Sequence, residues 1–151
     1  MSGTYEGDII RPLGLVTLYS GYAELEIDSL LESLSGFGKL DDQVLRWPIG
    51  QKLAKAREII ESLSSEKLNE LKKKLDEAVA LFDRRNALVH GAILAGTSVV
   101  QSRVSGCEQL VTPDALTSLA DEIFSVKEHI NANRQRILEP VLVAMQNTDE
   151  R

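Results

Sequence analysis

The clearest helical pattern in the chain lies in residues 68–91, whose sequence is LNELKKKLDEAVALFDRRNALVHG. Its apolar residues recur at steps of three and four: Leu68, Leu71, Leu75, Ala78 and Phe82. This spacing places them on one face of a helix. A seam this narrow is typical of helices that pack lengthwise against other helices. We therefore expect a helix here, ended by Gly91.

The N-terminal part of the chain carries a second helical pattern. It follows Pro12, which suits the first turn of a helix, and it stops at Gly36 and Gly38, because glycines commonly end helices. Its apolar residues also recur at steps of three and four: Val16, Tyr19, Ala23, Ile27, Leu30 and Leu34. Three further leucines widen this face: Leu18, Leu25 and Leu31. The helix is therefore expected to contact more than one neighbour.

Two more helices are predicted, one starting at Pro48 and one at Thr112. Thr112 is a good N-cap before Pro113, and we expect Pro140 to kink the last helix or end its straight part. Residues 92–111 are rich in glycine, serine and β-branched residues, which fits a small β-hairpin or an ordered loop. The economical fold is all-α: an antiparallel bundle of four main helices, with a short hairpin or loop before the last helix.

Length and composition predict one domain over residues 1–151. A chain of 151 residues matches the roughly 150 residues of a typical domain, and 43% hydrophobic with 26% charged residues is an ordinary globular composition. No apolar run approaches the roughly 18 residues that span a bilayer, and the acidic start is unlike a signal peptide. A lone cysteine, Cys107, cannot form a disulfide within the chain. We expect a cytoplasmic protein with no membrane partner.

The net charge of −6 argues against indiscriminate nucleic-acid binding. The charge is uneven, however. Residues 43–110 carry 11 basic and 8 acidic side chains, whereas the segments on either side are acidic. If a polyanion binds, we expect it to bind this middle segment.

The polar residues at the end of the 68–91 pattern form the main candidate site. The apolar seam continues from Phe82 toward Arg85 or Asn86, so polar side chains stand where the pattern predicts apolar ones. Asn86 and His90 are one turn apart and are expected to share an edge of the buried stripe, with Arg85 beside it. Arginine binds phosphate through a planar fork of donors, and histidine exchanges protons near neutral pH. Asparagine can orient the imidazole or hold a substrate oxygen.

These groups suffice for metal-free cleavage of RNA. A histidine can remove the proton from the ribose 2′-hydroxyl, which then attacks the adjacent phosphorus, while an arginine stabilises the charge on the phosphoryl oxygens. No cluster of carboxylates and histidines in the sequence points to a metal, and no cofactor is expected.

The segment from Arg85 to His90, RNALVH, resembles the signature of the HEPN (higher eukaryotes and prokaryotes nucleotide-binding) family. That signature is an arginine, commonly followed by a polar residue, with four to six residues before a histidine. The family is all-helical, and its motif lies on the third long helix, which is the layout predicted here. Many members are metal-independent endoribonucleases of toxin–antitoxin, phage-defence or RNA-processing systems, and they usually dimerise so that two motifs face one cleft.

The resemblance implies that Arg85 and His90 are catalytic and Asn86 supports them. Arg84 and Arg134 are further candidates for RNA contact. A subgroup of the family carries a tyrosine two residues after the histidine, which a nucleotidyltransferase-like antitoxin modifies. Ala92 occupies that position, so that form of control is not expected here.

Simpler interpretations exist for each of these residues. Arg84, Arg85 and His90 are also what a helix C-terminus favours electrostatically, and Asn86 could be a hydrogen-bonded core residue. His129 lies off the apolar stripe and is expected to face solvent. The lysines at 72–74 are interpreted as a solvated face.

The sequence thus predicts a homodimeric endoribonuclease that cleaves RNA at a composite site and associates with a cognate antitoxin or regulatory protein. The alternative is a non-catalytic interaction or regulatory module with the same fold. The overall acidity favours this alternative, because RNA-processing surfaces are generally basic.

Overall fold

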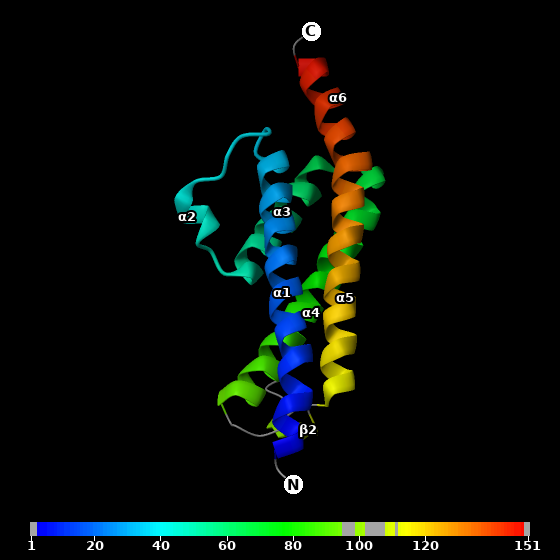
Figure 1. The fold of residues 1–151 in the computed structure, drawn as a ribbon. Helices are drawn as coiled ribbons and strands as arrows, with labels where there is room; N and C mark the ends of the chain where they lie inside the picture. The colour runs from blue at the N-terminus through cyan, green and yellow to red at the C-terminus, as the bar shows by residue number, and fades with distance from the viewer. Residues whose placement is uncertain (1–2, 95–98, 102–107, 111, 150–151) are drawn as a thin grey trace.

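A computed structural model of the chain describes residues 3–94, 99–101, 108–110 and 112–149. Long helices dominate this part of the chain (Figure 1), so the predicted all-α class is confirmed. Its elements, in chain order, are α1 (Gly3–Leu34), α2 (Asp42–Leu45), α3 (Ile49–Leu63), the 3₁₀ turn η1 (Glu66–Leu68), α4 (Asn69–Leu94), β1 (Val99–Gln101), β2 (Glu108–Leu110), α5 (Pro113–Asn133), the π-helical segment η2 (Arg134–Leu138) and α6 (Glu139–Asp149).

The core contains the apolar face predicted at residues 68–82. All five residues of that seam are at most 3% exposed: Leu68, Leu71, Leu75, Ala78 and Phe82. They meet buried residues of the other long helices, such as Ile27 of α1, Leu53 of α3 and Ile123 of α5. Burying a large aliphatic side chain contributes about 1.5–3 kcal/mol, so this seam is a main source of the stability that holds the helices together.

Helices α1 and α5 are parallel neighbours along the length of the molecule (Figure 1). The Tyr19 and Phe124 rings are 5.0 Å apart between their centroids, and further along both helices the Asn131 amide donates to Glu26 at 2.8 Å. Contacts that advance together along both helices require the same direction. The expected antiparallel arrangement is therefore wrong for this pair. The reason is that α4 runs back along the molecule and returns the chain to the end where α1 begins (Figure 1).

Two of the predicted helix ends are also wrong. α1 begins at Gly3, so Pro12 lies inside the helix rather than at its start. An internal proline removes one backbone hydrogen bond, but the buried position of Pro12 adds apolar contact. α4 continues past Gly91 to Leu94. The start of α5 is confirmed, because the Thr112 hydroxyl accepts a hydrogen bond from the amide of Ala115 and Pro113 occupies the first turn.

The long C-terminal helix is interrupted by the π-helical segment η2, just before Pro140. Ile130 and Leu138 are both buried although they are eight residues apart. In a regular α-helix a spacing of eight residues would turn Leu138 about 80° away from Ile130. A π turn holds one extra residue, so Leu138 returns to the buried face. Arg134 lies midway between the two.

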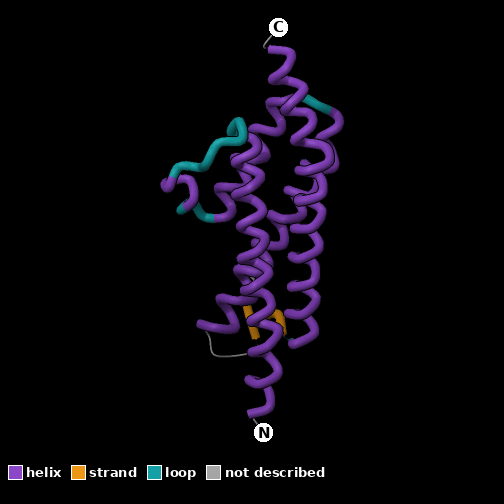
Figure 2. The backbone as a smooth tube through the Cα atoms, turned by 45° about the horizontal axis from the view of Figure 1, so that its top comes forward, coloured by secondary structure: helices purple, strands orange, loops and turns teal. Residues whose placement is uncertain are grey.

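Strands β1 and β2 are short compared with the helices (Figure 2) and pair antiparallel, with Val99 opposite Leu110 and Gln101 opposite Glu108. β1 packs against α4. The hairpin or loop expected over residues 92–111 falls partly outside the described residues, which omit 95–98, 102–107 and 111. Cys107 is among the omitted residues.

Candidate functional site

Arg85 continues the buried seam of α4 toward its C-terminal end. Its side chain is half-buried, and its guanidinium carbon lies 5.5 Å from the centroid of the Phe82 ring. A cation over an aromatic face is attracted to it. The Arg85 Nε is buried and has no hydrogen-bond partner within the described part of the chain. An unpaired buried donor costs about 1–3 kcal/mol, so this guanidinium retains capacity to bind an acceptor.

Asn86 and His90 face solvent, outside the buried stripe. The expectation that they share an edge of that stripe is therefore wrong. The seam steps by three residues from Phe82 to Arg85 and then to the buried Leu88, which turns Asn86 outward. The simpler interpretation of Asn86 as a hydrogen-bonded core residue fails for the same reason.

Arg85 and His90 leave α4 in different directions. The helix is continuous between them, so five residues separate their side chains by about 140° around the axis and about 7.5 Å along it. Within one chain the two side chains therefore start from different sides of the helix.

Arg84, a candidate for RNA contact, is bound to Glu122 of α5. The pair lines a groove of about 360 Å³ between α4 and α5, together with Lys74, Glu77 and His129. His129 is exposed, as expected, and its Nδ1 lies 2.7 Å from the Ser125 carbonyl oxygen. Because cations and carboxylates alternate in this groove, it presents no surface of one charge to a polyanion.

Arg134, the other candidate for RNA contact, is held in a buried charge network. Its Nε donates to Glu26 of α1 and its NH1 donates to Glu139, both at 2.7 Å. Glu26 also accepts from Asn131 at 2.8 Å, and Glu139 accepts from the Ser33 hydroxyl at 3.1 Å. The network joins α1 to α5, η2 and α6.

The network also determines the ionisation of Arg134. Burial alone would lower the pKa of this guanidinium, but the hydrogen bonds and negative charges of Glu26 and Glu139 outweigh burial and raise the pKa above its usual value. The side chains of Arg134 and Glu26 are only 14% and 7% exposed, so the pair is shielded from salt. Arg134 is thus engaged within the fold.

Sequence reasoning missed this network, although it left a signal. Glu26 is adjacent to Ile27 and one turn from Leu30 on a helix whose neighbouring positions are buried. An acidic residue beside such a face requires a cation. A similar signal is Lys52, which is 4% exposed and lies 2.8 Å from Asp28 of α1.

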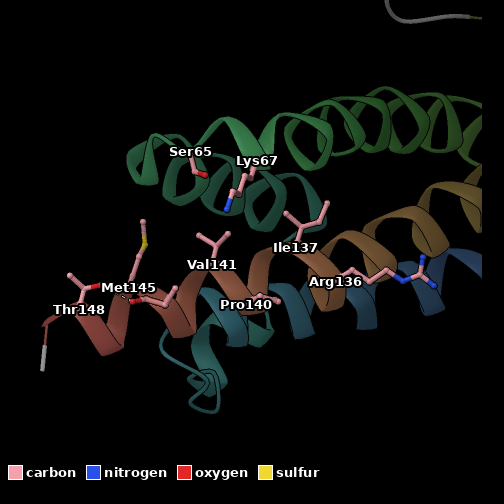
Figure 3. A pocket seen from close by; sticks show the side chains of 9 residues that line it. Ser65, Lys67, Arg136, Ile137, Pro140, Val141, Met145 and Thr148 are labelled. Atoms are coloured by element: carbon pink, nitrogen blue, oxygen red, sulfur yellow. Dashed lines mark hydrogen bonds between the residues drawn. The ribbon is translucent and has the colours of Figure 1, made fainter.

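Another groove lies at the opposite end of the core from Arg85, between η1 and α6 (Figure 3). Its volume is about 670 Å³. Figure 3 shows an apolar floor that includes Ile137 and Val141, with Lys67 and Arg136 beside it. None of the three predicted catalytic residues lines it. Its residues offer no histidine or carboxylate for acid–base chemistry.

Within the described ranges, no three His, Cys, Asp or Glu side chains gather closely enough to hold a metal ion. Over the same ranges, no helix has both the length and the apolarity that a membrane crossing needs. Comparisons with protein-family models, with curated proteins and with solved structures found no match.

Proposed function

We propose that the chain is a metal-independent endoribonuclease of the HEPN type that acts as a homodimer. The observation that carries the proposal is the half-buried Arg85, whose Nε has no partner in the described part of the chain and which belongs to an arginine–asparagine–histidine motif with exposed Asn86 and His90. An unpaired guanidinium donor suits a phosphate oxygen. An exposed imidazole is accessible to a large substrate.

The mechanism uses two chains at each site. The His90 imidazole of one chain takes the proton of a ribose 2′-hydroxyl, and the 2′-oxygen attacks the neighbouring phosphorus. The bond to the 5′-oxygen breaks, that oxygen takes up a proton, and a 2′,3′-cyclic phosphate is left. Arg85 of the other chain binds the phosphoryl oxygens as their negative charge grows. Asn86 orients the imidazole or the substrate.

The first prediction concerns the catalytic pair. His90→Ala and Arg85→Ala should each reduce cleavage of single-stranded RNA, in the presence of a metal chelator, by at least about a hundredfold, as expected for loss of a general base or of a charge-stabilising donor. His129→Ala is the matched control for His90, because His129 is also exposed, and it should cleave like the parent protein. Parent-like rates for His90→Ala would show that the catalytic assignment is wrong.

Mixing the two inactive variants tests the composite site directly. In a mixed dimer, the Arg85→Ala chain supplies His90 and the His90→Ala chain supplies Arg85, so one intact site forms. The mixture should therefore regain part of the activity that each variant lacks alone. No recovery, in a mixture whose subunits are shown to exchange, would mean that the two groups do not act across chains.

A second candidate function is a non-catalytic interaction or regulatory module. It is favoured because both candidate RNA-contact arginines, Arg84 and Arg134, are neutralised by carboxylates, and because the net charge is −6. Growth of expressing cells separates the two functions. An active ribonuclease should slow growth unless a cognate antitoxin or regulatory protein is present, and Arg85→Ala should relieve the effect. Harmless expression and no cleavage by the purified protein would favour the interaction module.

The cellular setting belongs to the same proposal. A cytoplasmic toxin–antitoxin or phage-defence system would supply RNA as substrate and a protein that restrains the enzyme. Co-purification of a second protein from the native host, with release of RNA cleavage when that protein is removed, would support this setting. Cleavage by the host-purified protein without any such partner would contradict it.

A further inference from the structure

The outer face of α1 exposes large apolar side chains. Ile10 is 67% exposed, Leu18 47%, Tyr22 43% and Leu25 64%. A groove of about 340 Å³ between α1 and α5 adjoins Tyr22 and Leu25, and Phe124 forms its other side. Single exposed apolar residues are ordinary, but a contiguous row of them on one helix face marks an interaction surface.

Two glycines alternate with the exposed leucines on this face. Gly14, Leu18, Gly21 and Leu25 follow one another at steps of four, three and four residues, so they share one side of the helix. A Cβ atom at Gly14 or Gly21 would meet no atom within 4 Å. Glycine inside a helix is destabilising relative to alanine. Packing within the described part of the chain therefore gives no reason for either glycine.

We propose that this face is where two copies of the chain associate, with their α1 helices antiparallel about a two-fold axis between Tyr19 and Ser20. The axis places Leu18 opposite Gly21 of the partner subunit. It also places Leu25 opposite Gly14 of the partner subunit. A single axis thus places each of these two exposed leucines opposite a glycine of the partner subunit, and two-fold symmetry produces each contact twice. Such self-complementarity is what an isologous interface requires.

The charges along α1 agree with the antiparallel direction. The exposed Arg11 is near the beginning of the helix, whereas Glu32 is near its end. The proposed axis places Arg11 within one turn of Glu32 of the partner subunit, whereas Asp28 is already bound to Lys52 of its own chain. A parallel pair in register would instead oppose Arg11 to its own copy. Like charges disfavour that arrangement.

This inference does not depend on the chemistry proposed for Arg85 and His90, whose composite site would need a second contact between chains. The motif-bearing end of α4 lies where α1 begins (Figure 1), so an antiparallel pair of α1 helices carries the two motifs to opposite ends of the dimer. Association is measured without RNA, so the interface can be correct while the ribonuclease proposal fails. Conversely, active dimers whose association is unaffected by changes in α1 would support the enzyme and overturn the interface.

Gly21→Leu tests the interface. The new side chain meets open space in the monomer but opposes Leu18 of the partner subunit in the dimer. We expect the monomer to become more stable, since leucine is a better helix former, while the dissociation constant rises by about tenfold or more. These opposite effects separate lost association from misfolding. Gly50→Leu is the matched control, because a Cβ at Gly50 of α3 also meets nothing within 4 Å; it should leave association unchanged.

Sedimentation equilibrium of the full chain from low to high micromolar concentration gives the dissociation constants of the parent and Gly21→Leu dimers. A parent chain that stays monomeric throughout this range would overturn the proposal. So would a Gly21→Leu protein that dimerises as tightly as the parent.

Disulfide trapping tests the antiparallel register. In a Cys107→Ser background, one protein carries Leu18→Cys and a second carries Gly21→Cys. Oxidation of the mixture should trap a covalent dimer, whereas each protein alone should not. Trapping of the Leu18→Cys protein alone, with none between the two proteins, would show that the helices are parallel and the axis is wrong.

Discussion

At the scale of single residues, the sequence shows which chemical groups are present better than it shows which of them face solvent. The polar group at Arg85, Asn86 and His90 stood out because it interrupts an apolar pattern. The exposure of Asn86 and His90 could not be predicted, because a seam that steps by three or four residues can continue from Phe82 to either Arg85 or Asn86. The packing of α4 in the folded chain decides which face is buried, and that face contains Leu88 and not Asn86. The partners of Glu26 and Lys52 could not be predicted, because a sequence shows that a buried charge needs a partner without showing which one.

The charge network around Arg134 should be important for stability. Glu26→Gln keeps the size of the side chain but removes its charge, and the new amide NH₂ turns a donor toward Asn131 or Arg134. We expect the free energy of unfolding to fall by about 1.5–3 kcal/mol, the usual value for a hydrogen bond to a charged group, measured by urea denaturation.

The control for this change is Glu58→Gln. Glu58 is 72% exposed and 3.6 Å from Lys55, and exposed pairs of this kind contribute about 0–1 kcal/mol. Equal losses in the two variants would contradict the importance assigned to the buried network.

At the scale of elements, the interiors of helices can be predicted from the periodicity of apolar residues. The ends of helices can be predicted only where the capping residues have a defined position. The start of α5 was predictable because threonine and proline each have a defined position there. The start of α1 was not, because a proline suits a first turn but is tolerated within a helix where packing compensates. Gly91 likewise permits a helix end without requiring one. The π segment escaped prediction because the spacing of Ile130 and Leu138 has meaning only once both are known to be buried.

The cap of α5 gives the prediction at this scale. Thr112→Ala removes the hydroxyl that accepts from the Ala115 amide at 3.0 Å and should lower the free energy of unfolding by about 1 kcal/mol. Thr117→Ala, at an exposed position inside the same helix, should cause no loss, since alanine is the better helix former. Thermal denaturation followed by circular dichroism measures both. A Thr112→Ala protein as stable as the Thr117→Ala protein would show that the cap contributes nothing.

At the scale of the whole molecule, the class of fold was predictable and the directions of the helices were not. Each helix has one apolar face to bury, which is enough to predict helices packed on helices. The choice of neighbours depends on which faces are complementary, and the pairing of α1 with α5 arises from contacts more than a hundred residues apart in sequence, such as Glu26 with Asn131.

Association through α1 would make the stability of the whole molecule depend on its concentration. Because dimerisation stabilises only the folded state, the midpoint of thermal unfolding should rise as the parent protein is concentrated. The midpoint of Gly21→Leu should stay nearly constant over the same range. Differential scanning calorimetry at several concentrations measures the difference, and a constant midpoint for the parent would contradict the dimer.

The π segment η2 also limits how this sequence can vary. Losing one residue between Ile130 and Leu138 would only remove the π turn, because a spacing of seven residues in a regular α-helix keeps both side chains within about 20° of one face. Gaining one residue there would instead rotate every later side chain by about 100°. Leu138 would then leave the core and Glu139 would lose its contact with Arg134. By contrast, the connection around residues 35–41 is exposed and can change length at little cost. Natural variants of this protein should therefore gain or lose residues between α1 and α2, and should not gain residues between Ile130 and Leu138.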